Sequence, residues 1–472
     1  MGTVKIGLFG IGLNTYWPQF EGLLDKLLFY QGEIRKKMEE KKIQVVDAGM
    51  VDSPEKALFV AGLLAREGVE ICFLFISTYA LSSTVLPIAQ QLAVPIILLN
   101  IQPTAAIDYR KLDSMEDRGE MTGEWLSYCQ ACSLPEISSV FNRAGILYDV
   151  VSGFLQDEET WDEIFSWIEA ARVLHGMRRN RLGVLGHYYC GMLDVYTDMT
   201  MQSIVFGSHI ELLEMSELEA YRALVTNDEL ESKLEEFSRT FVISEDCEQK
   251  ELERTAKTSV ALDKLVEVHQ LGSLAYYYEG YAGDTSENIV TSVIAGNTLL
   301  TGKGIPVAGE CEIKNVQAMK IMSILEAGGS FSEFYAVDFN DDIVMLGHDG
   351  PAHFAISEGR VSLVPLPVYH GKPGKGLSIQ MSVKQGDVTL LSVCEGKDGL
   401  FLLVAEGESV PGPILQIGNT NSRYRFPVGA RRFINEWSKA GPSHHCAIGI
   451  GHIAKTLRKI AFLLKISYVE IK

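Results

Sequence analysis

The segment ICFLFI, residues 71–76, is apolar at every position and lies between two stretches with helical spacing. Similar apolar segments occur at Val4–Leu8, Ile43–Val46 and Pro95–Asn100. The pair Ser53–Pro54 is typical of a helix start, because serine caps free N–H groups and proline fits the first helical position. Nearly continuous apolar strands separated by helices indicate a parallel sheet covered on both faces. The chain is therefore expected to begin with a doubly wound α/β domain.

The same alternation returns downstream and then gives way to a different pattern. Strands expected at Arg181–Leu185 and Ser273–Tyr278 flank helical stretches, which indicates a second α/β domain. After Gly329, short strand-like runs follow one another without intervening helices, as in an antiparallel sheet or barrel. The expected fold class is α/β, with two doubly wound parallel-sheet domains followed by a β-rich, antiparallel or barrel-like domain. The expected domains are 1–175, 176–325 and 326–472.

Two further expectations concern less regular segments. Residues 103–145 are expected to be irregular. A strand region is expected at Ile204–Phe206 and Ile210–Leu213, where apolar residues are grouped. The first segment follows the expected strand Pro95–Asn100, and the second lies between the expected strands Arg181–Leu185 and Ser273–Tyr278.

Composition and charge limit the classes of partner. The 472 residues carry a formal net charge of -19, which argues against nucleic acid, whose phosphates attract clustered Lys and Arg. The amino terminus, MGTVKIGLFGIG, lacks the features of a secretory signal, and no apolar run of about 18 residues or more is present to span a bilayer. We therefore expect a cytoplasmic protein that binds neither nucleic acid nor membrane. Its eight cysteines are expected to be reduced thiols.

Two motifs have simpler explanations than a ligand site. Gly7, Gly10 and Gly12 follow the first strand with a GxxGxG spacing that differs from the dinucleotide fingerprint. A tight loop at the edge of the sheet is therefore favoured over nucleotide binding. Cys129 and Cys132 form a lone CxxC without the further ligands that a zinc site needs. They are interpreted as small residues on a buried helical turn.

Four potential metal ligands lie at predicted strand ends or in glycine-rich loops: Glu310, Asp338, His348 and His445. Loops at strand ends allow side chains that are distant in sequence to converge on one point. Mixed carboxylate and imidazole ligation suits Mn²⁺, Fe²⁺ or Co²⁺, and Mg²⁺ is a further candidate. The acidic residues at 338–342 are alternatively a solvated turn, so the spacing alone leaves both explanations open.

Five segments, in register along the chain, resemble the L-arabinose and L-fucose isomerase superfamily. They are HYYCGMLDVYTDMT (187–200), YYYEGY (276–281), AGECEIKNVQAMKIM (308–322), FYAVDFNDDIVMLGHDGP (334–351) and GPSHHCAIGIGH (441–452). The third is similar to the segment that carries the family's first metal-binding glutamate. The fourth is similar to the segment with the second acidic ligand and the first histidine, and the last to the paired-histidine segment. The resemblance covers essentially the whole chain.

What this resemblance implies is a metal-dependent interconversion of an aldose and its ketose, of the pentose or 6-deoxyhexose class, through an enediolate. Carried over by position, it implies metal ligation by Glu310, Asp338, His348 and His445. Glu310 and Asp338 would be the acid–base pair, with Mn²⁺ or another divalent cation as cofactor. The implied sugar contacts are Met192, Tyr278, His444 and His353. The resemblance also implies a homo-oligomer, a trimer or a hexamer, in which a neighbour's first domain completes the pocket.

Some positions depart from the family pattern. The arabinose-type pattern has a glutamate where Asp338 aligns, and Glu333 is a rival for the second carboxylate. Met121, in GEMTGEW, stands about where the family's first-domain histidine belongs, which leaves the identity of the sugar open. Two other functions stay possible on the same fold: a non-catalytic protein that binds or senses a sugar, and a metal-dependent aldolase or hydrolase.

Overall fold

The computed structural model describes residues 4–41, 43–279, 283–367, 374–417 and 419–472. The chain divides into two compact units, Met1–His175 and Gly176–Lys472. Each unit has its own sheets and its own clusters of buried apolar side chains. Within the described ranges, no helix is both long enough and apolar enough to cross a lipid bilayer.

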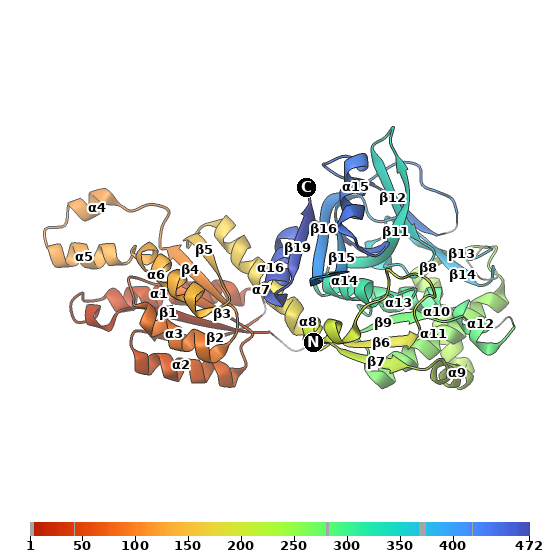
Figure 1. Cartoon of the computed structure of the whole chain (residues 1–472), viewed down its shortest axis with the longest axis horizontal. Coiled ribbons are helices and arrows are strands. Elements are labelled where there is room, and N and C mark those ends of the chain that lie inside the picture. The colour runs from red at the N-terminus through yellow and green to blue at the C-terminus, as the bar shows by residue number, and fades with distance from the viewer. Residues whose placement is uncertain (1–3, 42, 280–282, 368–373, 418) are drawn as a thin grey trace. The chain divides into compact units, whose positions relative to one another are not determined.

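The first unit contains a parallel sheet with strand order β2-β1-β3-β4-β5 (Figure 1). Its strands are β1 (Lys5–Ile11), β2 (Gln44–Val51), β3 (Ile71–Ile76), β4 (Ile96–Gln102) and β5 (Tyr148–Phe154). Its helices are η1 (Asn14–Tyr16), α1 (Leu23–Glu39), α2 (Pro54–Glu67), α3 (Ser82–Leu92), α4 (Tyr109–Asp113), α5 (Arg118–Leu126), α6 (Gln130–Ala144) and the greater part of α7 (Glu158–Arg178), whose last residues belong to the second unit. Because β1 and β3 are neighbours and β2 lies outside them, right-handed crossovers put α1 and α2 on opposite faces of the sheet.

Local signals explain the central part of this unit. Every residue of β3 is buried, as its unbroken apolar sequence predicts. The Ser53 hydroxyl accepts a hydrogen bond from the Lys56 N–H (3.3 Å), and Pro54 is the first residue of α2. The predicted helix start is therefore present, and α2, α3 and α6 share one apolar cluster against the sheet.

The expectation that residues 103–145 are irregular is wrong. The segment forms α4, α5 and α6. Asp108 and Asp117 cap the first two of these helices, and their carboxylates accept the N–H groups of Lys111 and Glu120. Cys129 lies at the start of α6 and is buried, whereas Cys132 is exposed, so only one of the two thiols fits the predicted buried turn.

The second unit begins with a parallel sheet of order β10-β9-β6-β7. Its strands are β6 (Arg181–Gly186), β7 (His209–Leu213), β9 (Ser273–Tyr277) and β10 (Val307–Ala308). The helices are α8 (Met199–Phe206), α9 (Met215–Ala223), α10 (Asn227–Thr240), α11 (Gln249–His269), α12 (Thr285–Val290), α13 (Ile294–Gly302) and α14 (Ile313–Ile324). The strand expected at Ile204–Phe206 is instead the end of α8, because Asp198 caps a helix there by accepting the N–H groups of Thr200 and Met201.

An antiparallel barrel follows in the same unit. The order β15-β18-β11-β12-β17-β16 closes through a β15–β16 pairing, and β19 adds to β16 in parallel. Its strands are β11 (Gly328–Asp338), β12 (Ile343–His348), β15 (Gly386–Gly396), β16 (Gly399–Val410), β17 (Thr420–Arg425), β18 (His445–Ile450) and β19 (Ser467–Ile471). A small sheet joins β8 (Phe241–Ile243), β13 (Val361–Pro365) and β14 (Leu377–Gln380), and the last helices are η2 (Phe354–Ile356), α15 (Ala430–Ala440) and α16 (Ala454–Leu464). The expected α/β fold class with a β-rich carboxyl-terminal part is confirmed, while a boundary at 325 stays a prediction.

Candidate metal centre

Glu310 lies in the turn that joins β10 to α14. Glu310 and Cys311 both have left-handed backbone conformations, with φ of 55° and 59°. Such a conformation costs on the order of 1–3 kcal/mol for a residue other than glycine and persists only where the surroundings hold it. Here the Cys311 N–H donates to the Tyr276 carbonyl (2.9 Å), and the Glu312 N–H donates to the Gly309 carbonyl (3.0 Å). The turn thus fixes the backbone from which the Glu310 side chain projects.

The register of three barrel strands brings further ligands together. Glu333 in β11 pairs with His445 in β18 on one side and with Gly347 in β12 on the other. His348 follows Gly347 and ends β12. The Phe331 ring packs against both imidazoles, with centroid distances of 4.3 Å to His348 and 4.4 Å to His445. Strand pairing therefore holds Glu333 beside two histidines that are distant from each other in the sequence.

The ligand atoms form two overlapping clusters, Glu310 with His444 and His445, and Glu333 with His348 and His445. Within each cluster these atoms lie within 4.8 Å of one another. The His445 Nε2 lies 3.5 Å from the Glu310 Oε2. Both atoms are buried, and neither has a hydrogen-bond partner with suitable geometry. Because unsatisfied buried polar atoms are rare, and carboxylate and imidazole donors suit Mn²⁺, Fe²⁺ or Co²⁺, these residues fit a divalent cation.

Glu312 orients His445 from the side away from the clusters. Its carboxylate is hydrogen-bonded to the His445 Nδ1, and both side chains are buried. Burial lowers the pKa of His445 to about 3, so the imidazole is neutral near pH 7. Burial also raises the pKa of Glu312 to about 7. With its proton on Nδ1, His445 presents the Nε2 lone pair that metal binding requires.

His444 occupies the other side of Glu310. Its Nε2 lies 3.3 Å from the Glu310 Oε2, and its Nδ1 lies 2.6 Å from the Asp194 Oδ2. Burial works against a charged ring, but the carboxylates of Glu310 and Asp194 outweigh it and raise the pKa of His444 to about 9. The imidazole of His444 therefore favours its charged form between the two carboxylates.

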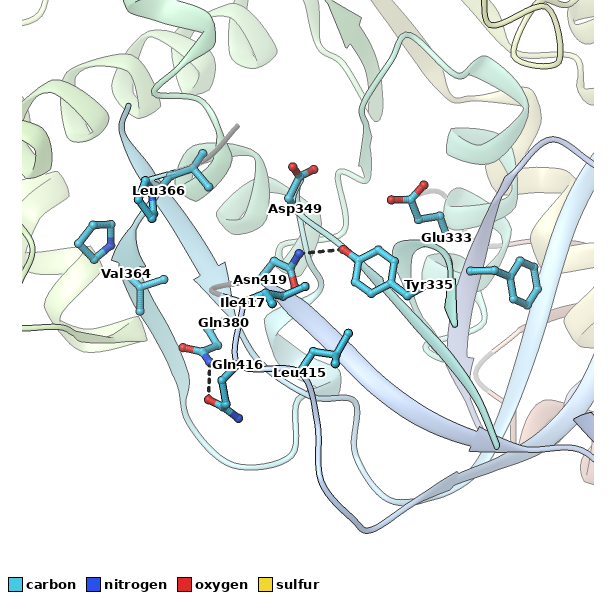
Figure 2. Close-up of a pocket in the computed structure, with 13 residues that line it drawn as sticks. Glu333, Tyr335, Asp349, Val364, Leu366, Gln380, Leu415, Gln416, Ile417 and Asn419 are labelled. Carbon is cyan, nitrogen blue, oxygen red and sulfur yellow. Dashed lines mark hydrogen bonds between the residues drawn. The ribbon is translucent and has the colours of Figure 1, made fainter. Parts of the chain in front are cut away.

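A pocket of about 170 Å³ opens onto this centre. It is lined by Tyr189, Met192, Tyr276, Tyr277, Gly309, Glu310, Glu333, His348, Asp349, Gly350 and His444. A larger groove of about 940 Å³ shares Glu333 and Asp349 with the pocket. Figure 2 shows the Tyr335 hydroxyl and the Asn419 side chain, which are hydrogen-bonded to each other (2.9 Å), in this groove near the two shared carboxylates. The centre is thus accessible from a small polar pocket that adjoins a larger space.

The structure brings together three of the four predicted ligands, Glu310, His348 and His445, but it does not bring Asp338 to them. Asp338 ends β11, where its Oδ1 accepts the N–H groups of Asn340 (3.0 Å) and Asp341 (3.1 Å) in the turn. Strand residues advance by about 3.3 Å each, so Asp338 lies roughly 16 Å along the strand from Glu333. Glu333, the rival in the sequence, is the carboxylate beside the histidines.

The predicted sugar contacts divide in the same way. Met192 and His444 line the pocket, whereas Tyr278 and His353 are not among its lining residues. Tyr278 packs against the apolar cluster of the second unit's first sheet. His353 is buried, its N–H donates to the Ser330 hydroxyl (3.2 Å), and burial lowers its pKa to about 4. The final two residues of the YYYEGY motif lie outside the described residues.

Four residues that shape the centre are absent from the sequence prediction: Tyr276, Tyr277, Glu312 and Asp194. The two tyrosines belong to the YYYEGY motif, and the two carboxylates lie in the quoted motifs AGECE and GMLDV. The motifs therefore include the segments that meet at this pocket. The backbone conformation determines which side chain in each segment faces the pocket. The sequence alone does not show this conformation.

Comparisons with known proteins add a separate line of support. No family model matches the chain. The L-arabinose isomerase of Bacillus subtilis (strain 168) is 26% identical over 329 residues, which are 66% of this chain and 64% of that protein. The sulfoquinovose isomerase of Alkalicoccus urumqiensis is 21% identical over 293 residues, with coverages of 62% and 65%. The L-arabinose isomerase of Aeromonas salmonicida (strain A449) is 20% identical over 333 residues, with coverages of 68% and 66%.

The chain thus spans slightly less than two thirds of the length of these curated relatives. Among solved structures, a periplasmic solute-binding protein of an ABC transporter from Actinobacillus succinogenes 130z, with bound D-allose, is 11% identical. That match covers 62% of this chain and 83% of the other, and its TM-score of 0.17 is too low to carry an argument. The curated relatives agree with the motifs. By sequence, the chain is related to the sugar isomerases.

Proposed function

We propose that this protein is a metal-dependent isomerase that interconverts an aldose and its ketose, of the pentose or 6-deoxyhexose class. The observation that carries the proposal is that two carboxylates and two imidazoles, Glu310, Glu333, His348 and His445, form overlapping clusters, and that the first three of these residues line one pocket. The buried Glu310 Oε2 and His445 Nε2, neither of which has a hydrogen-bond partner of suitable geometry, support a cation at this point. The names of the distant relatives support the reaction class, and the sugar class rests on the motif resemblance.

Glu310, Glu333, His348 and His445 would hold the divalent cation, with Mn²⁺ as the first candidate and Co²⁺, Fe²⁺ or Mg²⁺ as others. When bound, such an ion would polarise the oxygens of the sugar and stabilise negative charge that develops during proton transfer. Glu312 keeps the His445 ring in the tautomer that suits this role. These residues explain why the site needs both imidazoles and carboxylates.

The two carboxylates have separate tasks in the proposed reaction. Conversion of an aldose to a ketose moves one proton from C2 to C1 and one from the C2 hydroxyl to the C1 oxygen, so atoms and charge balance. We assign the carbon-bound proton to Glu310, because its strained turn fixes the backbone from which the side chain projects. Glu333, which lines both the pocket and the groove, is assigned to the proton exchanged between the oxygens. A well-placed carboxylate contributes about 10²- to 10⁴-fold to such a step.

A sugar panel tests this proposal. Purified protein with added Mn²⁺ is incubated with pentoses and 6-deoxyhexoses, and ketose formation is followed by ¹³C NMR. At least one aldose should be converted to its ketose, and the same equilibrium ratio should be reached from the ketose. Because isomerisation leaves the mass unchanged, mass spectrometry separates it from aldol cleavage or hydrolysis.

Matched carboxamide variants assign the carboxylates in the same assay. Glu310→Gln and Glu333→Gln should each lower kcat by about 100-fold or more, because each removes a proton-transfer group. Asp338→Asn is the control and should retain near-normal turnover, since Asp338 only closes its own turn. The proposal is refuted if no sugar in the panel reacts, or if Glu310→Gln has wild-type activity.

A further inference from the structure

Two side chains outside the proposed ligand set, Asp194 and His444, are hydrogen-bonded to each other, and His444 lines the pocket. Asp194 belongs to the segment between β6 and α8, and His444 immediately precedes β18. The Asp194 Oδ2 accepts two hydrogen bonds from His444, one from its backbone N–H (3.0 Å) and one from its Nδ1 (2.6 Å). One carboxylate oxygen therefore fixes both the backbone and the ring of His444.

The opposite edge of the same ring faces the reacting region. The His444 Nε2 lies 3.3 Å from the Glu310 Oε2, and His444 lines the 170 Å³ pocket. The ring also lies against the imidazole of His445, with 3.9 Å between centroids. Rotation of the ring by half a turn would exchange its nitrogens for carbons and remove the nitrogen that faces Glu310. The bond from Asp194 to Nδ1 opposes that rotation.

Asp194 is itself held in place through its backbone. Its carbonyl oxygen accepts hydrogen bonds from the Lys314 Nζ and from the Ser443 hydroxyl (3.0 Å). Lys314 and Ser443 are both buried. Lys314 lies in the first turn of α14, the helix that follows the Glu310 turn, and Ser443 directly precedes His444. The carboxylate of Asp194 is therefore preorganised relative to both Glu310 and His444.

We propose that Asp194 is a positioning residue for the reaction and acts through His444; this inference rests on the proposed isomerase function. Asp194 accepts the His444 Nδ1–H and thereby keeps the Nε2 edge of the ring directed at Glu310 and at the hydroxyl groups of a sugar in the pocket. Asp194 is not among the residues that line the pocket. Its contribution therefore depends entirely on the presence of the His444 ring.

A double-mutant cycle tests this dependence. Asp194→Ala should lower kcat/KM by about 10- to 100-fold, because a small misplacement of a group that faces the reacting region can cost up to about 10²-fold, with the larger part in kcat. In a His444→Ala background the same substitution should produce no further loss. Asp194→Asn should recover most of the activity, because the His444 backbone N–H keeps the amide oxygen turned toward the ring. Affinity for Mn²⁺, measured by calorimetry, should change by less than about threefold, since no proposed ligand is altered.

Asp198→Asn is the matched control on the same segment. Asp198 caps α8 and makes no contact with His444, and asparagine caps a helix about as well as aspartate. This variant should behave like the wild type. The proposal is overturned if Asp194→Ala keeps wild-type kcat/KM, or if it lowers kcat/KM by the same factor with and without the His444 ring, because a general effect on folding would then be the cause.

A spectroscopic measurement keeps this inference separate from the proposed function. In protein labelled with ¹⁵N-histidine, the His444 Nδ1 proton should give a low-field resonance that disappears in His444→Gln and in Asp194→Ala. Absence of that resonance from the wild type would overturn the Asp194–His444 bond, whatever the activity. Absence of turnover with every sugar, while the resonance is present, would instead refute the isomerase function and with it the catalytic role of Asp194.

Discussion

Residues that are hydrogen-bonded to a proposed ligand set the orientation and the tautomer of that ligand. Glu312 lies one residue beyond the strained pair Glu310 and Cys311, and its carboxylate holds the His445 Nδ1. Glu312→Gln conserves the size of the side chain but introduces an amide that can donate to Nδ1 and favour the wrong tautomer. We expect the affinity for Mn²⁺ to fall by about 10- to 100-fold, as for other partners of metal-bound histidines.

Isothermal titration calorimetry at constant pH measures this effect. Glu395→Gln is a suitable control, because Glu395 lies in the same unit and its carboxylate accepts hydrogen bonds from Thr197 and Asp198 rather than from a proposed ligand. The control should bind Mn²⁺ like the wild type. An unchanged affinity in Glu312→Gln would show that Glu312 does not orient His445.

The choice between Asp338 and Glu333 as the second carboxylate ligand could not be made from the sequence. Asp338 and Glu333 lie on the same strand, and Asp338 stands closer in sequence to the Gly347–His348 turn. The structure favours Glu333 because β11 pairs with β18 so that Glu333 opposes His445. Register between strands that are distant in the sequence is a tertiary property. The residues around Asp338 and Glu333 contain no local pattern from which this strand register could be predicted.

At the scale of elements, α14 contains a buried lysine with a measurable consequence for stability. Lys320 is 4% exposed, and its Nζ donates to the Gly304 carbonyl (2.9 Å). Burial lowers the pKa of Lys320 from 10.5 to about 8. Between these two values the unfolded state binds more protons than the folded state, so this group's contribution to stability becomes more favourable as the pH rises from about 8 to 10.5. Below pH 8 the Lys320 side chain is charged in the folded and the unfolded state, so the full free-energy cost of burying this charge lowers the stability of the fold.

Lys320→Met removes this penalty while conserving the length of the side chain. At pH 7 the variant should unfold at a higher temperature than the wild type, because a shift of this size corresponds to about 3 kcal/mol, partly offset by the lost hydrogen bond to Gly304. The difference should shrink at pH 10. Thermal unfolding followed by circular dichroism at both pH values measures it, and a variant that is less stable than the wild type at pH 7 would contradict the prediction.

The elements that the sequence predicted well are those with strong local signals. β3 is apolar at every residue, and α2 begins at a serine followed by proline. The segment 103–145 also carried such signals, since Asp108 and Asp117 are typical helix caps, but the helices that they start have weak apolar periodicity. The strand predicted at Ile204–Phe206 is the end of α8: these apolar residues are consecutive in the sequence, as in a buried strand, but Asp198 marks the start of a helix. Capping residues were the usable signal in both cases.

At the scale of the whole molecule, the sequence predicted an α/β fold with a β-rich carboxyl-terminal part, and the structure confirms it. The closure of the barrel by pairing of β15 with β16 could not be predicted from the sequence, because it depends on which strands pair and not on the residues of any one strand. The family resemblance identified the motifs that meet at the pocket. The expected trimer or hexamer and the separate boundary at 325 stay predictions.

Anomalous diffraction from crystals grown with Mn²⁺ would show whether Glu310, Glu333, His348 and His445 bind one divalent cation, as we propose. We expect one strong manganese peak with an atom from each of the four side chains at about 2.0–2.4 Å, and no manganese at Asp338. A manganese-loaded crystal with no peak among these four residues, or with manganese held by Asp338 instead, would contradict it.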